Sequence, residues 1–324
     1  MTITTSAQLP SLEQLPETYL IELSDLGAIS LLGDDQRSYL QGQVTCDVTD
    51  STASNLLTGA HCDAKGKVFS VFRLMQRSSA YFLLQPKATI ESSLKELRKF
   101  GVFSKVTIDE VEGLDCIALV GEQASHLLQQ EFSQVPDSLT PVVEVNSTSL
   151  VYICGEQPRY IIIDKKVVIT AFSEKLALTT YSQPVWNLLE ISQGFPILNA
   201  KTSGQYVPQM LNLQAINGIS FTKGCYLGQE TVARMQYLGK NKRALFCLNT
   251  QLEQPFQADD IIEKQLGENW RKAGDLLTYY QADNGSCVLQ TVMINDGELP
   301  SMRVASKADS VVTNKTLPYT LEAK

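Results

Sequence analysis

Residues 218–235 read GISFTKGCYLGQETVARM, and no other stretch of the chain holds as much chemical information. Its first apolar residues, ISF, have the composition of a short strand, and its end, TVARM, is compatible with a helix. Between them, Gly224 and Gly228 bracket one thiol, Cys225, and one phenol, Tyr226. Because glycine lets the backbone turn sharply, we expect an exposed loop that presents both side chains.

The surroundings of Cys225 are basic. If the thiol lies just before the helix N-terminus and within reach of Lys223, the helix dipole and the cation both favour the thiolate. The pattern therefore predicts a reactive cysteine, and the local charge favours an anionic ligand. A structural cysteine stays open as the alternative, since neither a histidine nor an obvious base accompanies the thiol. The segment 222–243 has a charge of +4, because Glu230 is its single acid and five residues are basic: Lys223, Arg234, Lys240, Lys242 and Arg243.

Upstream of this stretch the sequence predicts a mixture of strands and helices. Residues 19–23 and 27–32 are rich in apolar and β-branched side chains, and a short polar turn between them predicts adjacent strands. Residues 56–62 and 68–75 flank a glycine-containing connection of hairpin length. The segment around Leu94 has the apolar spacing of an amphipathic helix. This alternation favours an α+β fold with segregated layers over a doubly wound parallel sheet.

The pattern of apolar and turn-forming residues changes after residue 240. Short strand-like pieces separated by Gly, Pro, Asn and Asp follow one another, which is the pattern of a small β-barrel. We therefore expect a first region of residues 1–240, which contains a second lobe at roughly 113–180, and a C-terminal β-barrel of residues 241–324.

Composition excludes several classes of function. The chain of 324 residues has 35 acidic and 27 basic side chains and a net charge of −8, which argues against DNA binding and against coating RNA by bulk electrostatics. Its 7 cysteines show no paired spacing and suggest reduced thiols in the cytoplasm. The first sixteen residues contain neither Lys nor Arg nor a continuous apolar run, so we expect no targeting signal and no membrane partner. With 2 histidines and no CxxC or HExxH spacing, we expect no metal site.

The octapeptide KGCYLGQE at 223–230, with PQMLNL at 208–213 and VAR at 232–234, resembles the signature of the YgfZ folate-binding family. The resemblance extends over nearly the whole chain. QGQVTCDV at 41–48, AHCDAKGK at 60–67 and GENWR at 267–271 are similar to family segments as well. An eight-residue match around a fixed cysteine is far more specific than a glycine-rich loop alone.

The resemblance implies a fold and a set of partners. The family is similar in fold to the T protein of the glycine cleavage system and to the N-terminal domain of the GTPase TrmE. Both bind tetrahydrofolate derivatives in a central cavity between α+β lobes, and a C-terminal β-barrel lies alongside. The resemblance implies tetrahydrofolate or another folate as the cofactor, and iron–sulfur enzymes or their assembly proteins as partners. Contact with tRNA would be indirect, through the methylthiolation that those enzymes carry out, and control of replication initiation is a further link.

The resemblance also singles out residues around the expected folate. Trp186 lies in a predicted helix, where it is either a core indole or a flat surface for the pterin ring, and its match to a folate-contacting tryptophan favours the second interpretation. Glu190 would supply a polar contact to the pterin. Leu26 stands where close relatives have an aromatic residue that contacts folate. The resemblance implies that Leu26 also contacts the folate, although an aliphatic side chain cannot stack on the ring. Arg234 would order the loop through the backbone or Glu230, or bind the folate carboxylates.

Other candidates have simpler alternatives. Cys225 is the candidate functional thiol, and Lys223 and Tyr226 beside it are further candidate catalytic residues. Lys65 and Lys67 are ordinary hairpin-turn lysines or contacts for the glutamate tail of folate. His61, Cys62 and the remaining cysteines are interpreted as packing residues.

Three functions remain to be compared. The first is a folate-dependent accessory factor for iron–sulfur enzymes, which the resemblance favours over an enzyme. The second is a tetrahydrofolate-dependent transferase of aminomethyl or formyl groups, for which the sequence places no acidic catalytic group. The third is a protein that binds tRNA directly, which only the +4 segment supports.

Overall fold

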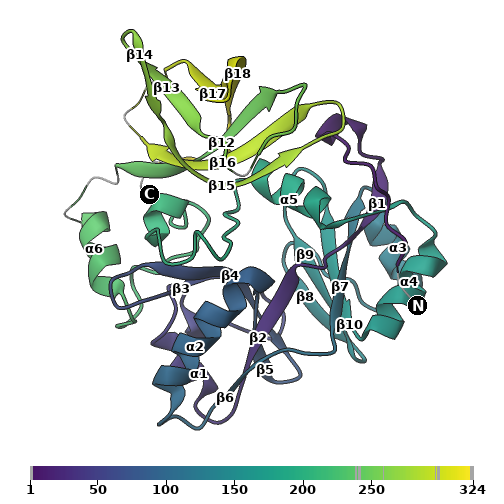
Figure 1. The fold of residues 1–324 in the computed structure, drawn as a ribbon. Helices are drawn as coiled ribbons and strands as arrows, with labels where there is room; N and C mark the ends of the chain where they lie inside the picture. The colour runs from purple at the N-terminus through teal and green to yellow at the C-terminus, as the bar shows by residue number, and fades with distance from the viewer. Residues whose placement is uncertain are drawn as a thin grey trace.

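The computed structural model describes residues 3–237, 239, 242–257, 259–295, 297 and 300–321. Within them the chain forms three β-sheets with helices packed between and outside them (Figure 1). Two sheets come from the first 181 residues, and the third begins at Arg243. The predicted α+β architecture with a C-terminal β-barrel is confirmed in this arrangement. Short 3-10 helices complete it: η1 (Leu12–Gln14), η2 (Val48–Asp50), η3 (Lys87–Thr89) and η4 (Pro208–Leu211).

The first sheet has five antiparallel strands, and apolar side chains of α1 and α2 pack on one of its faces. The predicted hairpin at 56–75 is confirmed here, because β3 pairs with β4 around the turn. The predicted amphipathic helix around Leu94 is α2. In spatial order the strands are β3 (Leu57–Cys62), β4 (Val68–Arg77), β5 (Ala80–Pro86), β2 (Leu26–Leu32) and β6 (Thr107–Glu110), and the helices are α1 (Gln36–Gln41) and α2 (Ile90–Gly101).

The second sheet has six strands and is covered on its outer face by α3 and α4, on the right in Figure 1. All its pairs are antiparallel except that of β1 with β11. In spatial order the strands are β11 (Thr180–Tyr181), β1 (Thr18–Glu22), β7 (Asp115–Gly121), β10 (Arg159–Asp164), β9 (Thr148–Ile153) and β8 (Val142–Val145), with α3 (Ala124–Glu131) and α4 (Lys166–Leu176) outside.

The prediction that residues 19–23 and 27–32 form adjacent strands is wrong. β1 lies in the six-stranded sheet and β2 in the five-stranded sheet. β1 already has β7 and β11 as neighbours, so both of its edges are occupied. Its central side chains, Tyr19, Leu20 and Ile21, are all fully buried, since apolar clusters cover both faces of the strand. A continuous apolar sequence of this kind indicates an interior strand, whereas the strands of a hairpin with one face in water would alternate apolar and polar residues.

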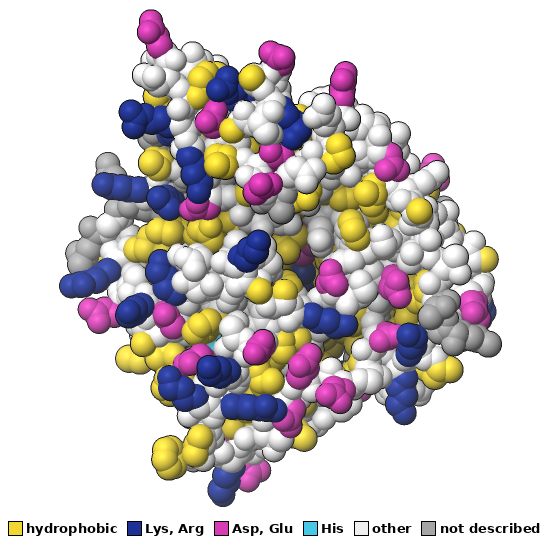
Figure 2. All heavy atoms as spheres, in the orientation of Figure 1, with side chains coloured by type: hydrophobic (Ala, Val, Ile, Leu, Met, Phe, Trp, Pro, Cys, Tyr) yellow, Lys and Arg dark blue, Asp and Glu magenta, His cyan; other side chains and the backbone are white. Residues whose placement is uncertain are grey.

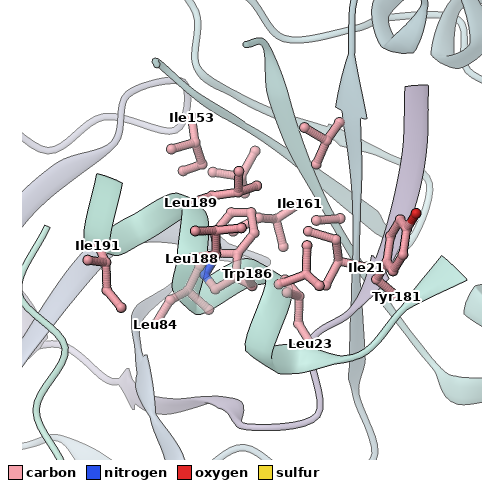
Figure 3. Packing of buried hydrophobic residues seen from close by; sticks show 14 of the residues in the cluster. Ile21, Leu23, Leu84, Ile153, Ile161, Tyr181, Trp186, Leu188, Leu189 and Ile191 are labelled. Atoms are coloured by element: carbon pink, nitrogen blue, oxygen red, sulfur yellow. The ribbon is translucent and has the colours of Figure 1, made fainter. Parts of the chain in front are cut away.

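Helix α5 (Gln183–Ser192) lies at the centre of the molecule, where it packs against β1 and against two strands of the third sheet. Pro184 stands in its first turn, where proline costs the helix no hydrogen bond. Its side chains complete the largest apolar cluster, which joins all three sheets (Figure 3). This helix therefore fixes the relative position of the residues that face the centre.

The third sheet is a curled layer of seven antiparallel strands, at the top of Figure 1. The strand pieces predicted after residue 240 each fall in a strand or at its edge, and the sheet packs its own apolar cluster; these pieces are 244–248, 261–262, 274–280, 286–294 and 302–304. In spatial order the strands are β14 (Asn269–Lys272), β13 (Ile262–Leu266), β17 (Met302–Val304), β18 (Lys307–Lys315), β12 (Arg243–Gln251), β16 (Ser286–Ile294) and β15 (Gly274–Gln281). In the described part of the chain, no helix combines the length and the apolarity that a membrane span needs.

Candidate functional site

A cavity of about 320 Å³ lies beside α5, and we call it the central cavity. Its walls come from strands β2, β4 and β5, from α5, and from the segment 195–199 that comes after α5. Sites for small ligands are concave, of this size, and lined mostly by apolar side chains with a few polar groups. Its wall combines apolar, aromatic and charged side chains, among them Leu26, Arg73, Leu84, Trp186, Glu190 and Phe195.

An ion-paired cluster reaches the floor of the central cavity: Arg73 and Glu190 line the cavity, and Arg159 pairs with Glu190 without lining it. Glu190 accepts a hydrogen bond at Oε2 from Arg73 Nη2 and one at Oε1 from Arg159 Nη1, each at 2.7 Å. All three side chains are buried, with at most a tenth of their surface exposed. Burial lowers the pKa of Arg73, and the neighbouring carboxylate opposes that shift. Because two guanidinium groups face one carboxylate, the cluster has a net charge of +1.

Both arginines also lie over aromatic rings. The guanidinium carbon of Arg73 is 3.8 Å from the ring centre of Phe195, and that of Arg159 is 5.1 Å from the ring centre of Trp186. Such contacts hold a planar cation in a fixed orientation. The guanidinium of Arg73 is thus held by Glu190 at one edge and by Phe195 on one face, at the wall of the cavity.

Trp186 belongs both to the apolar core and to the cavity wall. Only 4% of its surface is exposed, and Figure 3 shows it among Leu23, Leu84 and Leu189. The same indole lines the central cavity, as does the half-buried Leu26 on β2. The structure therefore brings together Trp186, Leu26 and Glu190, three of the residues that the sequence singled out.

Sequence reasoning missed Arg73 and Phe195, which line the cavity, and Arg159, which pairs with Glu190. Arg73 left a signal, because it interrupts the otherwise apolar run VFSVFRLM of β4. A charged residue within a buried strand needs a partner of opposite charge, and such pairs concentrate at functional sites. The partner, Glu190, lies 117 positions further along the chain, and no periodicity connects the two.

The cysteine loop, residues 222–228, lies apart from the central cavity. Cys225 is exposed and lines a shallow depression of about 470 Å³ together with Phe100 and Tyr226. Helix α6 (Gln229–Tyr237) begins four residues after the thiol, so the predicted helix is present beyond the loop. The thiol and the buried Trp186 therefore line two separate hollows of the protein.

Lys223 points into the protein and away from solvent. Its Nζ atom donates hydrogen bonds to the carbonyl oxygens of Val44 at 2.9 Å and Cys46 at 2.7 Å. Burial lowers the pKa of Lys223 to about 8, and burial also raises the pKa of Tyr226, whose ring centre lies 5.2 Å from Nζ. The sequence prediction required the Lys223 cation to lie beside the sulfur of Cys225. The hydrogen bonds of Lys223 direct its Nζ atom to the carbonyls of Val44 and Cys46 instead. They make Lys223 an anchor of the loop.

Backbone contacts join the cysteine loop to the segment 41–48. Leu227 donates its N–H to the carbonyl of Gly42 at 3.0 Å, and Ser220 donates to Thr45 at 2.8 Å. The Thr45 hydroxyl donates to the carbonyl of Gly218 at 2.6 Å. The predicted strand at 219–221 is wrong. The backbone groups of this segment make single hydrogen bonds with the segment 41–48, and these do not form the regular pairing of a β-sheet. Two of the family-like segments are therefore neighbours in space.

The other predicted residues lie outside the central cavity. Arg234 is exposed and pairs with Glu230 at 3.7 Å, one helical turn away on α6. Lys67 donates to the carbonyl of Gln205 at 2.8 Å, and the backbone N–H groups of Lys65 and Lys67 both donate to Asp63. These lysines thus belong to an ordered hairpin turn. Lys240 of the +4 segment lies outside the described residues. Figure 2 shows basic and acidic side chains interspersed over the visible face, with several basic ones toward the side of α6 and the curled sheet.

Comparisons with known proteins bear on the family and the fold of the chain. A family model described as "YgfZ, beta-barrel domain" matches residues 241–307. The chain is 79% identical over 324 residues to the tRNA-modifying protein YgfZ of Colwellia psychrerythraea, covering 100% of both chains. It is 40% identical over 319 residues to the protein of that name from Photobacterium profundum, covering 96% of this chain and 94% of that one.

A solved structure shares the fold. The aminomethyltransferase T of the glycine cleavage system from Bartonella henselae superposes with a TM-score of 0.72 at 13% sequence identity, over 94% of this chain and 87% of that one. At that identity the likeness concerns the fold alone.

Proposed function

The chain belongs to the YgfZ family, and from that premise we propose that it binds a folate in the central cavity and supports tRNA modification as an accessory factor in the cytoplasm. Its relatives carry the name of tRNA-modifying proteins. The family-like segments around Cys225 support a folate as the small molecule, and the chain has the fold of an aminomethyltransferase of the glycine cleavage system.

The observation that carries the proposal is the composition of the central cavity. A pterin is a flat fused ring with polar atoms at its edge, and Trp186, Leu26 and Leu84 offer apolar walls for its faces. Arg73 offers N–H donors at the floor for its edge. Lys87 is exposed at the mouth, where its Nζ atom donates to the carbonyl of Ser24 at 2.7 Å, and its remaining N–H donors would meet the carboxylates of the tail. A bound reduced folate would supply a carrier for one-carbon groups, and these residues would bind and orient it.

The acids at the central cavity favour an accessory factor over a transferase. Glu190 lines the cavity, but both of its oxygens already accept hydrogen bonds from arginines, so its role there is to hold those two arginines. Asp25 lines the cavity as well and is exposed at its rim. A transferase of aminomethyl or formyl groups would have to use Asp25. Steady turnover of a methylene or formyl donor by the pure protein, abolished in Asp25→Asn, would reverse this preference.

Cys225 completes the proposal as the residue that meets protein partners. Its thiol is exposed on a loop anchored by the buried Lys223, so a partner can reach the sulfur without entering the cavity. Iron–sulfur enzymes and their assembly proteins are the partners we propose, with tRNA served through them. An effect on replication initiation would follow from the same folate-dependent role.

Fluorescence of the single-tryptophan protein tests the folate site. The chain has 2 tryptophans, and Trp270 lies on strand β14 of the curled sheet. In Trp270→Phe, only Trp186 reports, and tetrahydrofolate added without oxygen should quench its emission in a saturable manner. The matched control, Trp186→Phe, keeps Trp270 and should show no saturable quenching. Saturable binding by calorimetry that leaves Trp186 emission unchanged would move the site elsewhere, and absence of binding would remove the proposed cofactor.

A further inference from the structure

The charges around the central cavity fall into two groups. At the mouth, Asp25 and Lys87 are exposed and of opposite sign, so they cancel and are screened by salt. At the floor, Arg73 and Glu190 line the cavity, and Arg159, which does not line it, pairs with the second oxygen of Glu190; all three side chains are buried. Buried charges are screened far less than exposed ones. The charge that a ring inside the cavity meets is therefore the net positive charge of the floor.

The carboxylate at the floor cannot act as the partner of a cationic ligand. Each of its oxygens lies 2.7 Å from a guanidinium nitrogen. A carboxylate that is paired on both sides presents little net negative field to a third group. Arg73, by contrast, lines the cavity and carries five N–H donors, and contact with Glu190 occupies one nitrogen.

We propose that this floor makes the central cavity selective for 4-oxo folates and rejects their 2,4-diamino analogues, with Arg73 as the residue that determines the choice. The inference rests on the proposed function, because it assumes that a folate ring occupies the cavity. A 4-oxo pterin is neutral and offers a carbonyl oxygen to the Arg73 donors. A 2,4-diaminopteridine takes up a ring proton far more readily, binds well only where an unneutralised carboxylate faces it, and here meets a positive floor.

Folic acid and aminopterin form the matched pair of probes. They share the same tail and differ only at C4, which bears an oxo group in one and an amino group in the other. We expect the protein to bind folic acid at least about 10-fold more tightly than aminopterin, since the 4-amino group presents a donor where the Arg73 donors need an acceptor, and a buried donor left without an acceptor has an effect of that order. The preference should grow as the pH falls from 8 to 6, because more of the diamino ring is then protonated. A site with a free carboxylate would show the opposite trend.

Substitution of Arg73 separates selectivity from folding. Arg73→Met leaves Glu190 paired with Arg159 alone, so the floor becomes neutral and the ratio of the two affinities should fall to within about threefold. Arg73→Lys keeps the charge and should keep most of the preference, although it loses the flat contact with Phe195. The control is Arg98→Met, which removes an exposed arginine paired with Asp109 far from the cavity and should leave the ratio unchanged.

The outcomes distinguish the inference from the proposed function. Equal or tighter binding of aminopterin by the unmodified protein would overturn the inference and leave folate binding intact. An unchanged ratio in a folded Arg73→Met protein would do the same. If Arg73→Met does not fold, the pH trend of the unmodified protein decides the question by itself. If neither probe nor tetrahydrofolate binds, the proposed function fails, and the inference fails with it.

Discussion

Gly66 and Gly228 lie back to back, although they belong to segments separated by more than 150 residues. A Cβ atom added to Gly228 would lie 2.8 Å from the Cα atom of Gly66 and 2.6 Å from the carbonyl oxygen of Asp63. Both glycines have positive φ, +74° and +85°. Since a side chain at either position would strain the backbone, this contact requires glycine on both sides. It joins the hairpin turn 63–67 to the cysteine loop.

Gly228→Ala should therefore destabilise the protein by about 2 kcal/mol, because the new methyl group meets backbone atoms in a conformation that alanine disfavours. Gly224→Ala is the matched control within the same loop. A Cβ atom at Gly224 would meet no atom within 4 Å, so its effect should stay within about 0.5 kcal/mol. Urea unfolding of the two variants measures the difference. Equal stability of the two would show that the loop adapts freely to the hairpin turn.

Glu190→Gln should destabilise the protein by about 3 to 5 kcal/mol, because it leaves Arg73 and Arg159 buried without their shared carboxylate. Asp109→Asn provides the comparison, since it breaks an ion pair with Arg98 whose members are both more than half exposed, and should cost less than about 1 kcal/mol. Guanidinium unfolding monitored by circular dichroism gives both values. If Glu190→Gln lowered the free energy of unfolding as little as Asp109→Asn does, water would have to reach the floor of the cavity.

His61 should make stability depend on pH below neutrality. Burial lowers its pKa to about 3, and its Nδ1 atom lies 2.8 Å from the Ser93 hydroxyl. In the unfolded chain the imidazole binds a proton near pH 6.5, whereas in the native state it does not. The contribution of His61 to the free energy of unfolding is therefore complete above pH 6.5 and is lost as the pH falls toward 3. The share of His61 in the loss between pH 7 and pH 5 is about 2 kcal/mol. Urea unfolding of His61→Asn, which cannot take up that proton, should show a correspondingly smaller loss. Parallel pH profiles for the two proteins would contradict the prediction.

The two exposed cysteines should differ in function. Cys225 and Cys154 are both exposed, whereas only Cys225 lies on the family-like loop. In cells that lack their own copy of the protein, Cys225→Ser should fail to restore tRNA methylthiolation, and Cys154→Ser should restore it fully. Mass spectrometry of tRNA nucleosides measures the modified fraction. Full restoration by Cys225→Ser would show that the thiol is dispensable.

Local sequence patterns correctly predicted elements with a clear apolar periodicity or a clear turn signal. The apolar spacing of α2 and the glycine turn between β3 and β4 both identified their structures. Strand β18 (Lys307–Lys315) went unpredicted, because most of its side chains are exposed and polar and its pairing with β12 and β17 holds it in place. The separation of β1 from β2 also lies beyond local pattern, since a short polar turn suits a hairpin and a change of sheet equally well.

The candidate site was predictable where one residue type implies one environment. Trp186 in an apolar helix had to face the interior, and it does so at the cavity wall. The direction of Lys223 was not predictable, because a lysine beside a glycine can point outward or inward. The carbonyls of Val44 and Cys46 that hold it lie more than 170 residues away in the sequence. Long-range hydrogen bonds of this kind are settled by tertiary packing alone.

The central cavity and the depression around Cys225 have no described lining residue in common. A small molecule held against α5 would consequently leave the sulfur open to a visiting macromolecule, and the visitor would not displace the small molecule. Under the proposed function the two occupants would not compete for room, and the chain would act as an adaptor that keeps its cargo throughout an encounter.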